Sequence, residues 1–376
     1  MTTRRQFGLA AASLLAAPTL LKAQGNNKIF LGQSAAFSGP AAELGIQFHQ
    51  GARIWFDQVN AQGGVAGKTI EIKNLDDGYE PDRCAANTLK LIGEDVFALF
   101  GYIGTPTSLA ALPLLSKAQV PFIAPFTGAM GLREPFNKQV FHLRASYNDE
   151  TALIVRQLTN LGLKKIAVFY QNDAYGKAGL DGVTLALSKM DLKPVAQATV
   201  ERNSVDVAAA VRTINAAGPD AVVQISAYKS CAAYIRAARK AGYGGTFYNV
   251  SFVGTQALAD ELGKDGAGVV VSQVMPSPYS LARPIAREFA EAVKKAGGNA
   301  QVNFSSMEGY LAAKVVTEGL KRAGTRMNSR EGLIQGIESI GSQSLGGFQL
   351  NFSTSNHVAS SFVELSMLTG DGRVRT

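Results

Sequence analysis

A loop of small residues and hydroxyls at 101–108 (GYIGTPTS) has the composition of an anion-binding site. An apolar, strand-like run precedes it at 96–100, and a stretch with helical spacing follows it. The free amides and the dipole of a helix N-terminus favour a negative charge at such a junction. The loop lacks the Gly-Lys-Ser/Thr ending of a nucleotide-binding P-loop. It therefore predicts an anion site, but not a phosphate cradle of the P-loop kind.

Residue types that commonly catalyse reactions or hold metals form no recognisable group. His49, His142 and His357 stand in unlike contexts, without a Cys or acidic partner at ligand spacing. No zinc-protease, redox, hydrolase-nucleophile or dinucleotide-binding motif occurs. Asp76 and Asp77 form a carboxylate pair after a strand, and we interpret them as solvated or helix-capping acids. The sequence thus favours binding over catalysis, with no metal and no cofactor.

The first residues predict export. Residues 1–23 contain Arg4 and Arg5, then an apolar run, then Lys22 and a cleavage site near Ala23. The run TRRQFGL resembles the twin-arginine export pattern, with an ordinary secretory leader as the alternative. No other stretch approaches the about 18 apolar residues of a membrane span. We expect a periplasmic protein without stable membrane insertion.

The net charge and the cysteine content limit the possible partners and the possible disulfides. Removing the leader lowers the formal charge from +8 to +5, and the remaining basic residues are scattered, which argues against a nucleic-acid partner. An exported protein could join Cys84 and Cys231 in a disulfide. The two cysteines fall in different halves of the chain, each in a helical pattern, so we favour two separate, partly buried thiols.

The order of apolar runs predicts an α/β protein with two doubly wound, Rossmann-like lobes. Short β-branched runs alternate with amphipathic stretches, and the pattern restarts after residue 147. The helices near the C-terminus do not begin a third unit, so the chain should cross back near Met275 and again near Asn351. We expect lobe 1 at 27–143 plus 276–350, and lobe 2 at 144–275 plus 351–376. Several crossings would form a hinge.

Several segments resemble the type I periplasmic binding proteins of ABC importers, in particular the leucine/isoleucine/valine-binding group. They are NAQGGVAGK, DDGYEP, ALFGYIGTPTS, VPFIAPFTG, VFYQNDAYGKAGL and RAARKAGYGGTFY, in the family's order. The resemblance implies the type I fold, a multi-crossing hinge and a two-lobed clamp. The clamp would be a monomer that closes over a small carboxylate ligand and docks on an ABC permease.

The resemblance also implies ligand-binding residues. Thr105 falls where the family binds the ligand carboxylate, and Phe126, Thr127 and Gly128 match the second carboxylate-binding loop. The Thr127 hydroxyl lies one position early against the branched-chain pattern. Three tyrosines match positions that close over the ligand or lie near the hinge, with ordinary rim packing as the alternative: Tyr175, Tyr228 and Tyr279.

One departure from the family bears on the ligand. Ser251 stands where amino-acid-binding members carry an acidic residue, and no Asp or Glu lies between Asp220 and Asp260. A buried ammonium without a countercharge is costly. Leu44 also replaces a large aromatic residue. The ligand is therefore expected to be a carboxylate without an ammonium, or an amide, between aromatic walls. The candidates for those walls are Tyr102, Phe126, Tyr175, Tyr228 and Tyr279.

Three functions remain open at this stage. The first is the solute-binding subunit of an ABC importer, for an amino acid or a related organic acid or amide. The second is a ligand-sensing module for a receptor or histidine kinase. The third, a periplasmic enzyme, lacks a catalytic group.

Overall fold

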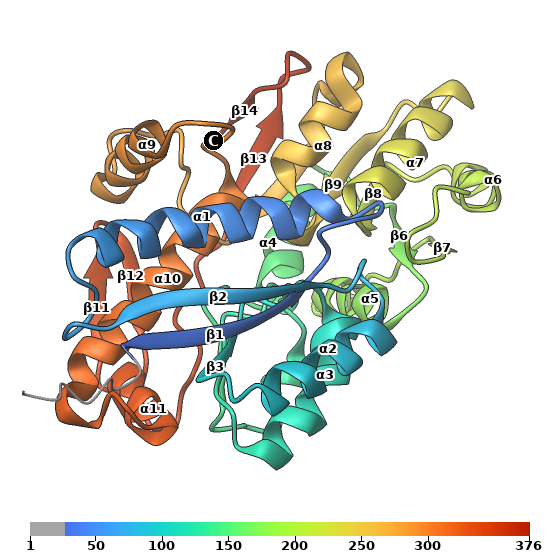
Figure 1. Cartoon of the computed structure of the whole chain (residues 1–376). Coiled ribbons are helices and arrows are strands. Elements are labelled where there is room, and N and C mark those ends of the chain that lie inside the picture. Colours follow the sequence, from blue (N-terminus) through green and yellow to red (C-terminus); the bar gives the residue numbers. More distant parts are fainter. Residues whose placement is uncertain (1–26) are drawn as a thin grey trace, which may run out of the picture.

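The computed structural model describes residues 27–376, so the predicted export signal at 1–23 lies outside the described residues (Figure 1). The first sheet has five strands, all parallel, in the order β2-β1-β3-β4-β5. The strands are β1 (Lys28–Ala35), β2 (Thr69–Asp76), β3 (Ala98–Phe100), β4 (Phe122–Ile123) and β5 (Val140–Phe141). The central strand β3 is buried throughout, as expected for a parallel sheet covered on both faces.

Helices from both ends of the chain cover this sheet. They are α1 (Ala42–Ala61), α2 (Pro81–Gly93), α3 (Thr105–Ala118), α9 (Pro284–Ala296), α10 (Phe304–Ala323) and α11 (Arg330–Glu338). Short 3-10 turns η1 (Met130–Leu132) and η4 (Gly324–Arg326) and the ribbon of β11 (Ser342–Leu345) and β12 (Phe348–Asn351) complete this part.

Two glycines let α1 and α10 approach closely. A Cβ atom added to Gly51 would lie 1.8 Å from the carbonyl oxygen of Ser306. One added to Gly309 would lie 2.0 Å from the carbonyl oxygen of Phe48. Only glycine fits at these positions, and the contact returns the C-terminal helix α10 to the N-terminal sheet.

The second sheet repeats the strand order of the first. Its order is β7-β6-β8-β9-β10-β13-β14, with the first five strands parallel and the last two antiparallel. The strands are β6 (Ile166–Gln171), β7 (Ala196–Val200), β8 (Ala221–Ile225), β9 (Thr246–Asn249), β10 (Val270–Gln273), β13 (Glu364–Leu368) and β14 (Val374–Arg375). The helices are α4 (Tyr147–Asn160), α5 (Ala174–Ser188), α6 (Ala208–Ala216), α7 (Tyr228–Lys240) and α8 (Thr255–Leu262), with 3-10 turns η2 (Ser251–Val253) and η3 (Gly263–Gly266). The predicted fold class, two doubly wound α/β units, is confirmed.

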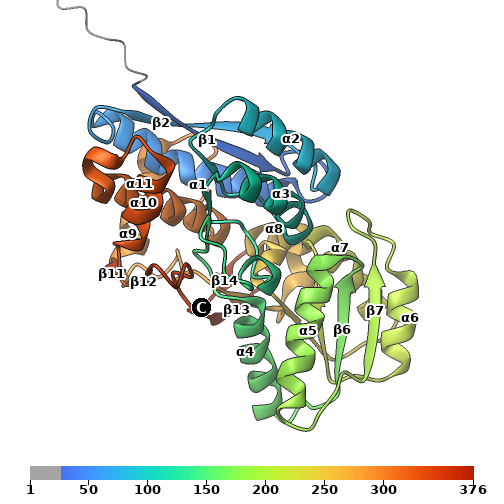
Figure 2. The same ribbon diagram turned by 90° about the horizontal axis from the view of Figure 1, so that it is seen from below.

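Figure 2 shows the blue and orange elements of the first sheet on one side and the green and yellow elements of the second on the other. The first crossing segment, at 142–147, pairs with the third, at 351–359, whereas the second lies near residue 275. The amide of His142 donates to the carbonyl of His357, and the amide of Ala359 donates to the carbonyl of His142, both at 2.8 Å. We propose the lobe limits given above as the division of the chain, and lobe 1 and lobe 2 have that meaning below.

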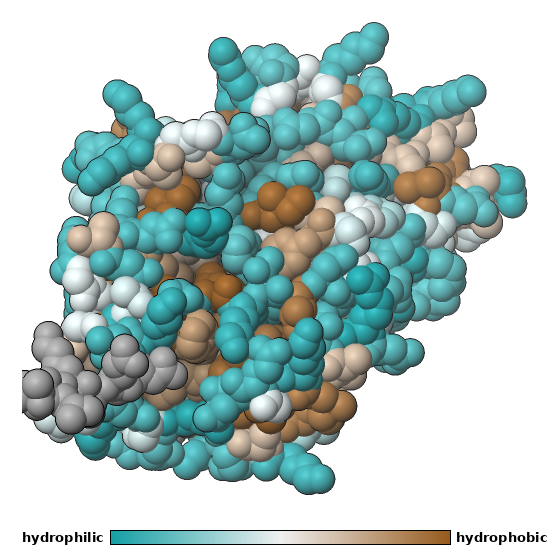
Figure 3. All heavy atoms as spheres, viewed as in Figure 1, coloured by the Kyte–Doolittle hydropathy of each residue, from teal (hydrophilic) through white to brown (hydrophobic). Residues whose placement is uncertain are grey.

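The surface in Figure 3 is largely hydrophilic, with small, separate apolar patches. Within 27–376, no helix is long and apolar enough to span a bilayer, and no group of three potential metal ligands is found. Cys84 and Cys231 are not joined. Both are completely buried, whereas partial burial was expected.

Asp77 corrects the interpretation of the carboxylate pair. Asp76 is partly exposed and accepts from the loop amides of Phe37 and Ser38, so it caps no helix. Asp77 is fully buried instead, where it accepts from the hydroxyl of Ser34 at 2.7 Å and from the amide of Tyr79 at 2.8 Å. It fixes the backbone that carries Tyr79. Burial raises the pKa of Asp77 to about 6.

This shift predicts a pH dependence of stability. Between the ordinary pKa of 3.8 and about 6, the native state binds a proton that the unfolded state has lost, so the contribution is present at low pH and disappears as the pH rises through 6. In Asp77→Asn the contribution is absent. The free energy of unfolding of the unmodified protein, relative to the variant, should fall by about 2 kcal/mol between pH 4 and pH 7. Urea unfolding at several pH values measures this difference, and a constant difference would contradict the assignment.

Candidate functional site

The two predicted carboxylate-binding loops lie side by side at the carboxyl edge of the first sheet. A parallel bridge joins Ile103 to Phe126, and the amide of Phe126 donates to the carbonyl of Tyr102 at 2.8 Å. This register brings the hydroxyl oxygens of Thr105 and Thr127 to 2.6 Å. Both side chains are buried. The pair lies at the carboxyl ends of β3 and β4, beside the point between β1 and β3 where the strand order reverses and where open α/β sheets bind ligands.

One hydroxyl hydrogen of the Thr105–Thr127 pair is not used in the hydrogen bond between the two residues. The Thr127 oxygen accepts from the amide of Ala129 at 3.2 Å, and one of the two hydroxyl hydrogens is used between the threonines. The other hydroxyl hydrogen is left for an acceptor. Carboxylate oxygens accept such bonds most strongly.

Two glycines admit aromatic rings beside the threonines. A Cβ atom on Gly104, whose φ is 102°, would lie 2.2 Å from the ring of Tyr79. A Cβ atom on Gly128 would lie 2.7 Å from the ring of Tyr147. Gly128, predicted as a ligand contact, therefore also makes room for Tyr147.

Tyr147 and Tyr175 each bring a buried hydroxyl to the site. Their ring centroids lie 5.4 Å apart, and neither hydroxyl has a hydrogen-bond partner among residues 27–376. Burial raises the pKa of Tyr147 to about 12, and the hydroxyls of Thr127 and Thr105 lie near its own. Both tyrosines stay protonated at neutral pH, so they offer O–H donors to an acceptor.

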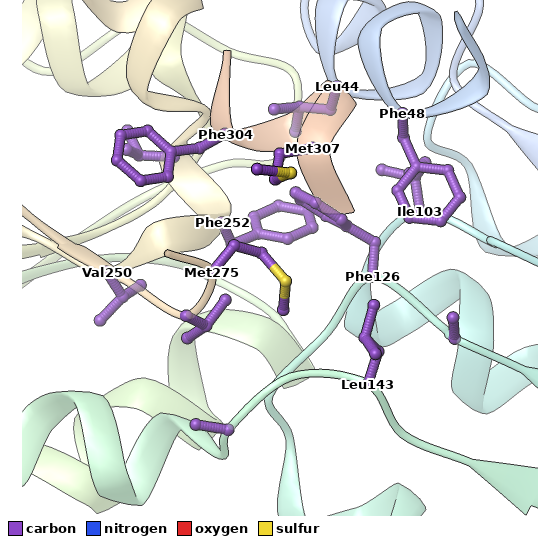
Figure 4. Packing of buried hydrophobic residues seen from close by; sticks show 14 of the residues in the cluster. Leu44, Phe48, Ile103, Phe126, Leu143, Val250, Phe252, Met275, Phe304 and Met307 are labelled. Atoms are coloured by element: carbon purple, nitrogen blue, oxygen red, sulfur yellow. The ribbon is translucent and has the colours of Figure 1, made fainter. Parts of the chain in front are cut away.

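Phe252, in η2 of lobe 2, contacts the aromatic residues of this site. Its ring centroid lies 4.5 Å from that of Tyr175, 5.7 Å from Phe126 and 5.8 Å from Tyr79. Figure 4 shows Phe252 and Phe126 facing each other, with Leu44 and Phe48 of α1 nearby. The site thus joins uncharged O–H donors to an apolar wall supplied by both lobes.

An acidic residue from another helix forms hydrogen bonds with Ser251. The carboxylate of Glu150 in α4 accepts from the amide of Ser251 at 2.7 Å and from its hydroxyl at 3.1 Å. It also accepts from Ser272 at 2.6 Å. Burial raises the pKa of Glu150. The carboxylate sought near the strand end is therefore present, but its oxygens already hold the η2 turn.

A buried ion pair links this turn to lobe 1. Arg144, on the first crossing segment, donates to both carboxylate oxygens of Glu308 in α10, at 2.8 and 2.7 Å. Its Nη1 donates to Ser251 at 3.2 Å, and its guanidinium lies 3.9 Å from the ring centroid of Phe126. Burial alone would lower the pKa of Arg144, but the Glu308 carboxylate raises it. We call Arg144, Glu308, Glu150 and Ser251 the hinge network.

The lobes also meet at the rim. Arg202 in lobe 2 pairs with Glu80 of lobe 1 at 2.9 Å and with Asp173 at 3.2 Å. The side chain of Asn203 donates to the carbonyl of Gly78 at 3.1 Å. Leu44 packs on Gly254, where a Cβ atom would lie 2.4 Å from its side chain. The structure is therefore that of a closed clamp.

Three tyrosines proposed as ligand contacts lie elsewhere. Tyr102 packs on Phe122 on the other face of the first sheet, and its hydroxyl lies 3.2 Å from that of Thr88. The Tyr279 hydroxyl donates to Gln256 at 3.0 Å near the second lobe crossing. The side chain of Tyr228 is buried at the start of α7 and lies beside the α1 backbone at Glu43, so it contacts the opposite lobe at the rim.

Two doubly wound lobes, closed over buried O–H donors, define the class of two-lobed solute-binding proteins. The family described as periplasmic binding protein matches residues 28–372, and the chain belongs to it. A possible leucine/isoleucine/valine-binding protein from Rhodopirellula baltica has a similar structure, with a TM-score of 0.87, 34% identity, and coverage of 92% of this chain and 95% of that one. A substrate-binding periplasmic protein from Ralstonia solanacearum has a TM-score of 0.87 and 29% identity, covering 92% and 99%.

The sequence of a curated relative supports the same family assignment. Leu/Ile/Val-binding protein homolog 7 of Brucella suis is 27% identical over 335 residues, which cover 84% of this chain and 82% of the relative. The family membership predicted from the sequence is confirmed.

Proposed function

We propose that the protein is the extracytoplasmic solute-binding subunit of an ABC importer. It captures a small carboxylate by lobe closure and delivers it to a permease. The observation that carries the proposal is the group of buried O–H donors without an acceptor, from the Thr105–Thr127 pair, Tyr147 and Tyr175. The names of the relatives, which are leucine/isoleucine/valine-binding and substrate-binding periplasmic proteins, support it.

The charges around the site favour a carboxylate without an ammonium group. Glu150 accepts three hydrogen bonds, and Asp173 accepts from the amide of Tyr175 while it pairs with Arg202. Neither acid is free to pair with an ammonium, whose burial would then be costly. The rest of the ligand would lie against Phe126, Tyr175 and Phe252, so we expect this part of the ligand to be apolar. An amino acid would need its ammonium to reach the rim.

A panel of acids tests both the ligand class and the role of Phe252. Thermal-shift measurements should show stabilisation by isovalerate or phenylacetate and little by leucine or the matching amines. In Phe252→Ala the space left by the ring should favour the larger acid, so the affinity ratio of phenylacetate to isovalerate should rise by about ten-fold, equal to about 1.4 kcal/mol. Mass spectrometry of compounds that purify with the protein gives an independent answer.

The control for this variant is Phe247→Ala. Phe247 is buried in β9 and packs on Tyr243, inside lobe 2. Its removal should cost stability, as core Phe-to-Ala changes do, without changing the ligand preference. Tight binding of leucine, or the same preference in Phe252→Ala as in the unmodified protein, would overturn the proposal.

A further inference from the structure

A cavity of about 420 Å³ lies at the hinge. It is bounded by η1 and the segment after it, by the first crossing segment, and by the turn at 355–358. Leu132, Phe136 and Val358 supply apolar wall, and Arg133 and His142 supply polar groups. We call it the hinge cavity. None of the residues that line it belongs to the Thr105–Thr127 pair or to the hinge network.

Arg133 is an incompletely partnered cation in this cavity. Its Nη2 donates to the carbonyls of Arg144 and Ala145, at 2.9 and 3.2 Å. Its Nε and Nη1 are buried and have no hydrogen-bond partner anywhere in the described part of the chain. Burial, with the nearby charge of Arg144, lowers the pKa of Arg133 to about 10, so it remains charged at neutral pH. A buried cation with unused donors is costly unless an anion meets it.

His142 adds an acceptor to the same cavity. It is 2% exposed, and its Nε2 lies 3.1 Å from the carbonyl oxygen of Leu132, which can only accept. The proton therefore sits on Nε2, and Nδ1 is an acceptor. Nδ1 is buried and has no partner among residues 27–376. Burial and the charge of Arg133 lower the pKa of His142, so the ring stays neutral.

Two carboxylates that line the hinge cavity limit which ligands it could bind. Asp149 and Glu134 also line the hinge cavity. Asp149 accepts from the amide and the hydroxyl of Ser146, at 2.9 and 2.7 Å. These two carboxylates disfavour an occupant with two negative charges, whereas the single cation and the apolar wall suit a monoanion with an apolar body.

We propose that the hinge cavity is a second ligand site, for a small hydroxy-monocarboxylate. The carboxylate accepts from Nε and Nη1 of Arg133, and the hydroxyl donates to Nδ1 of His142. Arg133 holds the first crossing segment through two carbonyls, and the backbone of His142 pairs with the third. An occupant would therefore bind beside the first crossing segment and contact the turn at 355–358 of the third. The inference does not depend on the transport function or on the ligand bound between the lobes.

The test uses the full chain carrying Thr105→Ala and Thr127→Ala, which removes the O–H pair between the lobes. Isothermal titration with 2-hydroxyisovalerate should show one equivalent bound. Isovalerate, which lacks the hydroxyl, should bind more weakly. Arg133→Met, added to the double variant, should weaken 2-hydroxyisovalerate by at least about ten-fold, because charge-assisted hydrogen bonds are lost.

Two further variants keep the test decisive. Arg239→Met is the matched control, since Arg239 also donates to two backbone carbonyls but lies at the surface of lobe 2, and it should leave binding unchanged. If Arg133→Met fails to fold, Val358→Trp fills the cavity while Arg133 remains, and it should abolish binding. Absence of binding to the double variant, or equal affinity after Arg133→Met or Val358→Trp, would refute the second site.

Discussion

Thr105→Ala combined with Thr127→Ala is expected to abolish ligand-dependent thermal stabilisation of the protein at micromolar concentrations of its ligand. The two hydroxyls lie 2.6 Å apart and share one hydrogen bond, so both are needed to present the free O–H to a carboxylate. Hydrogen bonds to charged groups contribute about 1.5–3 kcal/mol each, so losing this bond lowers the affinity by roughly 10- to 150-fold. Titration calorimetry with the acid found in the panel measures the loss.

The matched control is Thr88→Ala. Thr88 is also fully buried and hydrogen-bonded, but it lies in α2, beside Tyr102 and away from the lobe junction. The affinity of the Thr88→Ala variant for the acid should equal that of the unmodified protein. In cells lacking the chain, uptake of the acid should be restored by the unmodified protein and by Thr88→Ala, but not by the double variant. An unchanged thermal shift in the double variant would remove the threonine pair from the site.

Arg144→Met is expected to give the largest loss of stability, about 3–5 kcal/mol, because it leaves two buried carboxylates without their cation. Glu308 loses two hydrogen bonds, and Glu150 loses a nearby positive charge. Glu308→Gln should cost less, because Arg144 then keeps Ser251 and the charge of Glu150. Urea unfolding measures both free energies.

The pH dependence of Arg144→Met distinguishes lost charge from lost packing. Burial already raises the pKa of Glu150, and without Arg144 it rises further. The variant should therefore lose stability as the pH rises from 5 to 8, since the native state then has to release a proton. Arg53→Met, in a pair with Asp57 at 3.5 Å with both side chains more than 60% exposed, is the control and should change stability little. Equal effects of the two substitutions would show that the hinge network contributes no net stability.

The fold could be predicted because its signals are local. Alternating apolar runs and amphipathic stretches specify parallel sheets, and the C-terminal helices show that the chain returns to a lobe already formed. The loop at 101–108 was predicted as an anion site from its residues, whereas the roles of Thr105 and Thr127 came from the resemblance to the family. The structure places both loops at the carboxyl edge of one sheet, because each follows a strand of it.

The rest of the site depends on contacts between distant residues. Glu150 reaches Ser251 across 101 positions, and Arg144 reaches Glu308 across 164. No spacing rule indicates such pairs. Tyr102 was assigned to the ligand wall by proximity in sequence, but neighbouring residues of an extended segment point to opposite faces. Ile103 therefore faces the cluster with Phe48 and Phe126, while Tyr102 faces α2 and α3.

The N-termini of α3 and α5, which lie in opposite lobes at the junction, differ in how their positive ends are compensated. In α5 the carboxylate of Asp173 accepts from the amides of Tyr175 and Gly176, which offsets the positive end of that helix. In α3 the first turn has no acidic residue, and Gly104 provides no side-chain cap. An anion held between the lobes would therefore be attracted more strongly by the N-terminus of α3 than by that of α5, which favours a position of its charged end beside the first turn of α3.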